Sequence, residues 1–425
     1  GDGAASRRAV EAVWRIESSR IVGALARYTN DFALAEDVAS EALAEALVAW
    51  PRDGVPRDPT AWLLATGRRR AIDAFRRRSG RDERYAALAR DLGEGGTVTG
   101  APGAMAGDDD LLWDPDRIED DRLALLFVSC HPVLAKEARI ALTLRVVGGL
   151  TTEEIARAFL VPVPTVQARI TRAKKTLAAA RVPFEVPSVG DRPERLGSVL
   201  QVLYLIFSEG STASGGDDWM RPDLAYEAVR LARVLTRLVP DEPEAHGLLA
   251  LLELTAARFA ARTGPDGAPV LLEDQDRRRW DRSAIRRGRD ALASAVAAGR
   301  GLGPYGLQAA IAEQHDTARS VAETDWERIV LLYEALGRVA PSPVVELNRA
   351  VAVAMASGPA AGLAVVDELV AREVLSGSYL LPSVRGELLA RLGRRAEARG
   401  ELELAARLCG NARERGVLER KAAAL

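Results

Sequence analysis

Hydrophobic residues recur at helical spacing along almost the whole chain, whereas the alternating apolar and polar runs that indicate strands are nearly absent. The one tight glycine turn, Pro-Asp-Gly at 265–267, joins two helical patterns. The pattern therefore predicts an all-α protein. It divides into a compact helical block over 7–78, a linker over 79–118, a second small helical block over 119–183 and a long helical array over 194–425.

The composition agrees with a folded helical protein. Hydrophobic residues make up 48% of the 425 positions and charged residues 28%, which excludes wholesale disorder. Aromatic residues make up only 5%, which suits helices packed through Ala, Leu and Val better than a β-sandwich. The net charge is -2, from 58 basic and 60 acidic residues, so binding to nucleic acid depends on local clusters of charge.

Cysteine and histidine are too few for a disulfide scaffold or a zinc site. The chain has two cysteines, Cys130 and Cys409, and three histidines, so we expect no metal and no cofactor. The first residues contain no apolar segment, and the uncharged run over 350–366 is interrupted by Ser-Gly-Pro. We expect no signal peptide and no membrane span, and hence a soluble cytoplasmic protein.

The most specific local signal lies in the second block. Thr151 and Glu154 are spaced as a capping box before a short helix over 153–160, and 161–164 predicts a tight turn. Pro164 fits the first turn of the helix that follows. At 100° per residue, the apolar residues of that helix fall on one stripe that we expect to be buried: Val166, Ile170, Ala173 and Leu177.

The opposite face of this helix is basic and able to form hydrogen bonds. Its residues are Ala168, Thr171, Arg172 and Lys175, flanked by Thr165, Gln167 and Arg169. In a helix-turn-helix this is the face that enters a major groove, where the first residues read base edges and the cations bind phosphates. The alternative is an amphipathic helix whose charged side faces water. Six basic residues against two acidic ones between 151 and 181 favour DNA binding.

The first block places an acidic helix before an arginine-rich one. The segment 31–43 predicts an amphipathic helix with Glu36, Asp37 and Glu41 exposed, which on its own indicates a solvated face. A second helix, capped by Thr60, buries Leu64, Ala71 and Phe75. Seven arginines between 68 and 81, opposed by one aspartate, predict a phosphate-binding patch. Trp62 either stacks on an unpaired base or packs inside the block.

The linker is acidic. Between Asp82 and Asp121 there are twelve acidic residues against three arginines. One interpretation is a solvated tether; the other is a polyanionic strand that occupies a nucleic-acid channel of a partner.

Three motifs resemble bacterial extracytoplasmic-function sigma factors: AEDVASEAL at 35–43, PTAWLLATGRRRAIDAFRRR at 59–78 and the long run at 129–177. The resemblance implies that the first block is sigma domain 2 and the second is sigma domain 4. It also implies that the linker threads the RNA channels of the polymerase. Ser40 stands where the family commonly has Gln, and Arg69 where many members have Asn.

The resemblance also implies roles for individual residues. Glu36, Asp37 and Glu41 bind the clamp helices of the RNA polymerase largest subunit, and helix 164–178 reads the −35 element through the face described above. The loop 51–58 and the arginine helix melt the −10 element through Trp62, Arg68, Arg69, Arg70, Arg76 and Arg77.

The phrase LTLRVVGGLTTEEIARAFL resembles the subgroup with a long C-terminal tetratricopeptide-like extension. The array is consistent with this, since it predicts helix pairs with a period of roughly 34 residues. Those pairs are 223–239 with 243–261, 325–339 with 342–357, 360–371 with 379–392, and 394–409 with 411–422. The implied partners are core RNA polymerase, promoter DNA and a small YCII-like protein, with no membrane anti-sigma protein.

One dense patch of the array has a candidate pocket. Its residues are Asp274, Asp276, Arg277, Trp280 and His315. The alternative is an ion-paired junction between helices, because one histidine and scattered carboxylates make no catalytic constellation. We therefore expect a sigma factor and not an enzyme. The rivals are a helix-turn-helix regulator with a repeat-type sensor that does not act as a sigma subunit, and an enzyme housed in the array.

Overall fold

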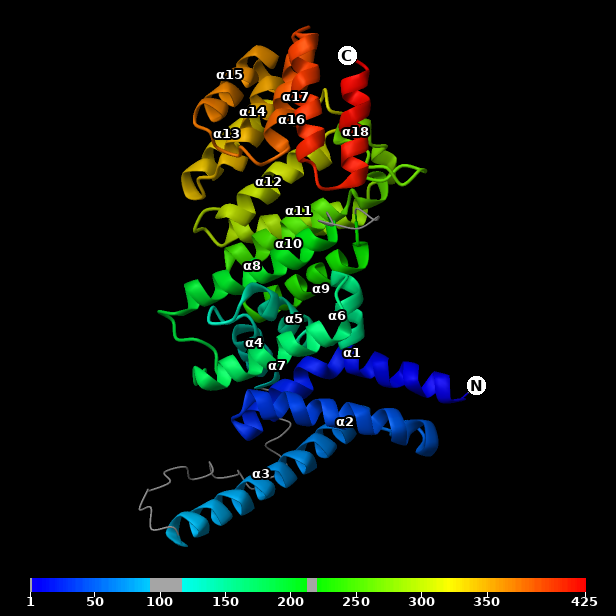
Figure 1. Cartoon of the computed structure of the whole chain (residues 1–425), viewed down its shortest axis with the longest axis vertical. Coiled ribbons are helices and arrows are strands. Elements are labelled where there is room, and N and C mark those ends of the chain that lie inside the picture. Colours follow the sequence, from blue (N-terminus) through cyan, green and yellow to red (C-terminus); the bar gives the residue numbers. More distant parts are fainter. Residues whose placement is uncertain (1, 92–116, 212–219) are drawn as a thin grey trace. The chain divides into compact units, whose positions relative to one another are not determined.

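The computed structural model describes residues 2–91, 117–211 and 220–425, which form eighteen α-helices and no strand beyond one isolated bridge (Figure 1). The predicted all-α class is confirmed for these residues. The chain divides into two compact units, residues 1–202 and 203–425.

Three long helices make up the first block of the first unit: α1 (Asp2–Thr29), α2 (Phe32–Asp53) and α3 (Pro59–Asp91). The Asp31 carboxylate caps α2 by accepting a hydrogen bond from the Leu34 amide at 3.0 Å. α2 packs on α1 and α3. The fully buried positions of α2 are mostly small, which lets the neighbouring backbones approach: Ala35, Ala39, Ala42 and Ala46.

The start and the end of α3 differ from the prediction. Asp58, not Thr60, caps this helix, because its carboxylate accepts a hydrogen bond from the Ala61 amide at 3.0 Å. The helix also continues to Asp91, through the first part of the predicted linker. The rest of the acidic linker, 92–116, lies outside the described residues.

The second block of the first unit consists of four shorter helices: α4 (Ile118–Ser129), α5 (Lys136–Val146), α6 (Thr152–Phe159) and α7 (Val163–Ala179). α7 packs on α5 and α6. The leucines of α4 and α5 supply most of the core of this block, and Leu125, Leu126, Leu142 and Leu144 are fully buried.

Helix α8 (Arg192–Ser211) crosses the boundary between the two units. Its first turns belong to the first unit, because Arg195 donates a hydrogen bond to the Phe127 carbonyl at 2.8 Å and Ser198 bonds the Cys130 carbonyl. The division between the two units falls between residues 202 and 203, inside this helix.

The second unit is a helical array in which successive helices pack on one another. Its α-helices are α9 (Pro222–Leu238), α10 (Pro243–Ala256), α11 (Arg282–Ala297), α12 (Pro304–Thr317), α13 (Trp326–Val339), α14 (Pro343–Ser357), α15 (Pro359–Ala371), α16 (Leu380–Arg391), α17 (Arg395–Leu408) and α18 (Ala412–Ala423). The loop between α10 and α11 has three short 3-10 helices: η3 (Phe259–Ala261), η4 (Leu272–Asp274) and η5 (Arg277–Arg279).

The predicted helix pairs agree with this array to within a few residues, except that 257–261 lies beyond α10. Glycines inside the helices set the close spacing. A Cβ added at Gly362 of α15 would meet the Ala354 Cβ of α14 at 2.5 Å, and one at Gly386 of α16 would meet Leu402 of α17 at 2.9 Å. Any larger side chain at these positions forces the helices apart.

In the part of the chain that the structure describes, no helix is both long and apolar enough to cross a bilayer.

The capping box of α6 is predicted to stabilise the second block. The Thr151 hydroxyl accepts a hydrogen bond from the Glu154 amide at 3.1 Å, and the Glu154 carboxylate accepts one from the Thr151 amide at 2.7 Å. Thr151→Ala should lower the free energy of unfolding by about 1 kcal/mol, measured by urea titration with hydrogen exchange over 152–179. Thr152→Ala, which removes no cap, is the control; equal losses in both variants would contradict the account.

Candidate nucleic-acid interface

A helix-turn-helix lies at the end of the first unit. Leu160 ends α6 in the left-handed region, at φ 53°, and Pro162 precedes α7. The predicted capping box and turn are confirmed. The predicted buried stripe is confirmed as well, because the buried residues of α7 are Val166, Ile170, Ala173 and Leu177.

The opposite face of α7 is open to solvent. Gln167, Ala168, Thr171, Arg172 and Lys175 are exposed, and Thr165 and Arg169 are half-buried beside them. Within the described residues, no carboxylate pairs with Arg169, Arg172 or Lys175. This cationic face is therefore available to an external polyanion.

The arginines of α3 fall into two groups. Arg76 and Arg77 are exposed and have no ion pair among the described residues. Arg69 and Arg70 each donate a hydrogen bond to the Glu45 carboxylate of α2 at 2.8 Å. Arg68 lies 5.7 Å from the centroid of the Tyr28 ring. Arg68, Arg69 and Arg76 line a groove of about 780 Å³ along α3, together with Thr60, Leu64 and Ile72.

Trp62 is half-buried, and its ring meets Trp50 edge to face with centroids 5.6 Å apart. This contact supports the interpretation that Trp62 packs inside the block. Leu64 and Ala71 are buried as predicted, whereas Phe75 is only half-buried.

The prediction that all three acidic residues of α2 are exposed is wrong for one of them. Asp37 and Glu41 are exposed, but Glu36 is only 5% exposed. Its position on the helix places it against cations of the second block.

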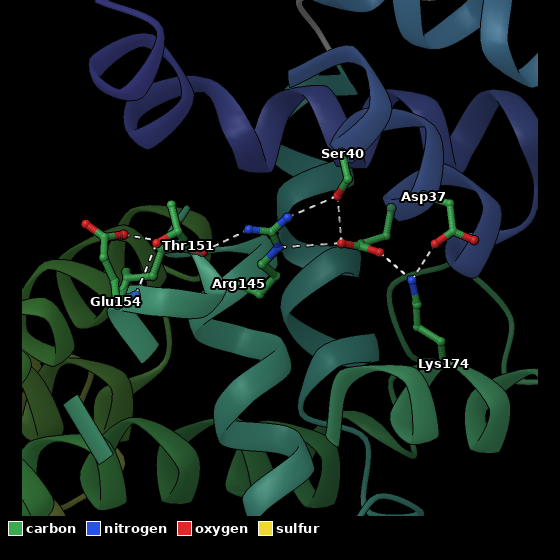
Figure 2. A network of polar contacts seen from close by, with 8 residues as sticks. Asp37, Ser40, Arg145, Thr151, Glu154 and Lys174 are labelled. Carbon is green, nitrogen blue, oxygen red and sulfur yellow. Dashed lines mark hydrogen bonds and ion pairs between the residues drawn. The ribbon is translucent and has the colours of Figure 1, made fainter. Parts of the chain in front are cut away.

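These cations are Lys174 of α7 and Arg145 of α5 (Figure 2). The Lys174 ammonium lies 2.5 Å from both the Glu36 and the Asp37 carboxylates. Arg145 lies 3.6 Å from Glu36 and donates a hydrogen bond to the Ser40 hydroxyl at 3.1 Å. We call these five residues the Glu36 cluster.

The cluster keeps a buried carboxylate charged. Burial alone would raise the pKa of Glu36, but Lys174 and Arg145 outweigh it and hold the pKa below its ordinary value. Burial would likewise lower the pKa of Lys174, and the two carboxylates raise it above its ordinary value. Sequence reasoning missed Lys174 and Arg145 because more than 100 positions separate them from Glu36.

The candidate residues of the array do not converge on one site. Arg277 donates hydrogen bonds to the His315 and Ala318 carbonyls at 2.7 and 2.9 Å, and its guanidinium lies 4.4 Å from the centroid of the Trp280 ring. Asp276 caps η5 and pairs with Arg278 at 2.9 Å. Asp274 is exposed. These contacts support the alternative of a structural junction.

His315 lines a cavity of about 370 Å³, with Trp326, Tyr333 and Met355 among its other walls. Burial and the neighbouring arginines lower the pKa of His315 to about 3, so its ring is neutral at pH 7. In the described residues, no group of three or more His, Cys, Asp and Glu side chains gathers as a metal site would require.

Comparison with known proteins matches each block of the first unit to a family model. Residues 15–81 match the family described as Sigma-70 region 2, and residues 124–177 match Sigma-70, region 4. Residues 195–296 match a family of unknown function (DUF6596). The chain belongs to the sigma-70 family, as an extracytoplasmic-function type of sigma factor with a C-terminal helical extension.

A relative from Rhizobium meliloti (strain 1021), described as an uncharacterized protein, is 47% identical over 400 residues, which cover 92% of this chain and 90% of the relative. No solved structure gives a significant match. The two sigma domains point to a transcription factor that acts in initiation, with RNA polymerase and promoter DNA as partners. None of these matches supports the expected YCII-like partner.

The junction at Arg277 makes a prediction about stability. Arg277→Met removes two charge-assisted hydrogen bonds to backbone carbonyls and should lower the free energy of unfolding of the second unit by about 2 kcal/mol. Urea titration with hydrogen exchange over 304–318 measures it. Asp274→Asn, at an exposed position, should change it by less than about 0.5 kcal/mol. No loss in the Arg277 variant would remove the structural role.

Proposed function

We propose that this chain is a promoter-recognition subunit of bacterial RNA polymerase that binds two promoter elements through separate blocks. The observation that carries the proposal is the division of α7 into a buried apolar stripe and an exposed cationic face that has no ion pair within residues 2–91, 117–211 and 220–425. A cationic face left unpaired in a chain of net charge -2 favours an external polyanion as its partner.

In this proposal α7 lies in the major groove of the −35 element. Gln167 and Thr171 carry hydrogen-bonding groups to base edges, and Thr165 and Ala168 pack beside them. Arg169, Arg172 and Lys175 bind phosphates and fix the register of the helix on the duplex.

The groove along α3 is the proposed contact with the −10 element. Arg76 and Arg77 are the strongest candidates for phosphate binding, since their charges are unpaired within the described residues. Arg68, Arg69 and Arg70 lie on the same helix, but the last two must exchange Glu45 for phosphate. The edge-to-face contact of Trp62 with Trp50 favours a packing role for Trp62 over base stacking.

We propose that the acidic surface of α2 binds core polymerase through Asp37 and Glu41, and through Glu36 once it is uncovered. The binding and the chemistry are then divided: the polymerase supplies the chemistry, and this chain selects the site. A protein with this role works beside the chromosome, in the cytoplasm. The array over 203–425 acts as a fused regulator.

The alternative is a helix-turn-helix regulator that binds DNA without polymerase. Pull-down of core polymerase by the full chain separates the two proposals. Glu41→Arg should weaken the capture at least tenfold, since it reverses a charge of the proposed contact. Glu41 is the better test position, because Asp37 pairs with Lys174 of the second block, whereas the partner of Glu41, Arg70 at 3.9 Å, lies within the first block.

Glu11→Arg is the matched control for this capture. Glu11 is an exposed glutamate of α1 and is not among the residues that we assign to polymerase. Failure of the unsubstituted chain to capture polymerase, or equal losses in the two variants, would favour the regulator.

The salt dependence of DNA binding tests the role of α7. Arg172→Gln and Lys175→Gln should each reduce the slope of log K against log salt by roughly 1, because each removes one phosphate contact. Fluorescence anisotropy of the full chain with a labelled duplex measures the slope. Lys136→Gln, which removes an exposed cation of α5, is the control and should leave it unchanged. Unaltered slopes in all three variants would place α7 away from DNA.

A further inference from the structure

The Glu36 cluster joins the two blocks through charges that neither block satisfies alone. Glu36 and Asp37 lie on α2, and their cationic partners lie on α5 and α7 (Figure 2). The Lys174 side chain is only 15% exposed, which is unusual for a lysine and reflects its two carboxylate partners.

The contact between the two blocks also includes α1, which bonds to α4. Arg27 of α1 pairs with Asp121 of α4 at 2.9 Å, and Arg122 donates a hydrogen bond to Ser19 at 3.1 Å. A Cβ added at Gly149, which has φ 72°, would meet the Ser18 hydroxyl at 2.7 Å. The two blocks are therefore docked closely in the described state.

The docked state occupies part of the surface that we assign to polymerase: it buries Glu36 and engages one carboxylate oxygen of the exposed Asp37. Lys174 bonds Asp37, and Arg145 bonds Ser40, one turn further along the same face. The DNA-reading face of α7 remains exposed in this state, as the exposure of Gln167, Arg172 and Lys175 shows. Docking thus occupies part of one binding surface and spares the other.

Docking also conflicts with binding two promoter elements at once. The −10 and −35 positions are about 25 base pairs apart, or roughly 85 Å at ~3.4 Å per base pair. In the docked state Lys174 pairs with Glu36, and Arg69 pairs with Glu45 nine residues along α2, about 14 Å at ~1.5 Å per residue. The path from Lys174 on α7 to Arg69 on α3 therefore consists of two ion pairs and about 14 Å of α2. This path is far shorter than the roughly 85 Å between the two promoter elements.

We infer that Arg145 and Lys174 form a docking surface for the acidic face of α2 in the same chain, and that this docking competes with core polymerase. The competition with core polymerase rests on the proposed function, whereas the docking of the two blocks does not. Because both partners regain water when the blocks separate, the docked state is reversible, and its population sets the apparent affinity for polymerase.

The test uses the full chain with spin labels at two exposed positions, Val48→Cys on α2 and Arg181→Cys after α7. Both native cysteines are buried. Pulsed EPR should give one short distance for this chain. Adding Lys174→Glu should lengthen and broaden it, and Lys174→Met should act in the same direction while adding no negative charge. Lys136→Glu, at an exposed lysine of α5 in the same block, should leave it unchanged.

The second readout is the affinity of unlabelled chains for core polymerase. Lys174 lies outside the proposed polymerase surface, so Lys174→Glu can tighten binding only by releasing α2. We expect about a tenfold gain if one chain in ten is open. Lys136→Glu should give none.

Each outcome bears on one half of the inference. A long distance in the chain without a substitution at 174 overturns the docking itself. A distance that lengthens in the Lys174 variants without any gain in affinity overturns the competition. If no variant binds polymerase while the distances change as expected, the proposed function fails and the docking stands.

Discussion

The first unit depends on how an ionised carboxylate is kept charged inside it. Glu36 is 5% exposed, and a charge so placed is tolerated only with close partners of opposite sign. Lys174 and Arg145 are those partners, and both come from the other block. The packing of α2 against α5 and α7 is therefore stabilised by the two cations that the buried Glu36 carboxylate requires as partners.

The same constraint divides α7 by function. Its apolar stripe packs within the second block, Lys174 faces α2, and the remaining cations face solvent. One helix thus contributes to a core, to a contact between blocks and to a surface suited to a polyanion.

Local features of this structure follow from the sequence, and contacts between distant segments do not. The capping box at Thr151 and the stripe from Val166 to Leu177 depend on residues within a few turns, and the periodicity predicts them. The partner of Glu36 is 138 positions away, and no local pattern identifies it. The pattern predicts Thr60 as the cap of α3, but the Asp58 carboxylate accepts the hydrogen bond that caps it. In the array, Arg277 binds the backbone carbonyls of His315 and Ala318 at the end of α12, partners that no local pattern around Arg277 identifies.

The central claim is that this chain selects promoters for RNA polymerase. The most direct measurement is transcription in vitro with purified core polymerase on a pool of bacterial genomic fragments, with the 5′ ends of the transcripts mapped. The account predicts that the chain, or the chain released by Lys174→Glu, directs initiation at defined sites that share two sequence elements, whereas core polymerase alone does not. Initiation no more specific than that of core polymerase with both forms of the chain would contradict it.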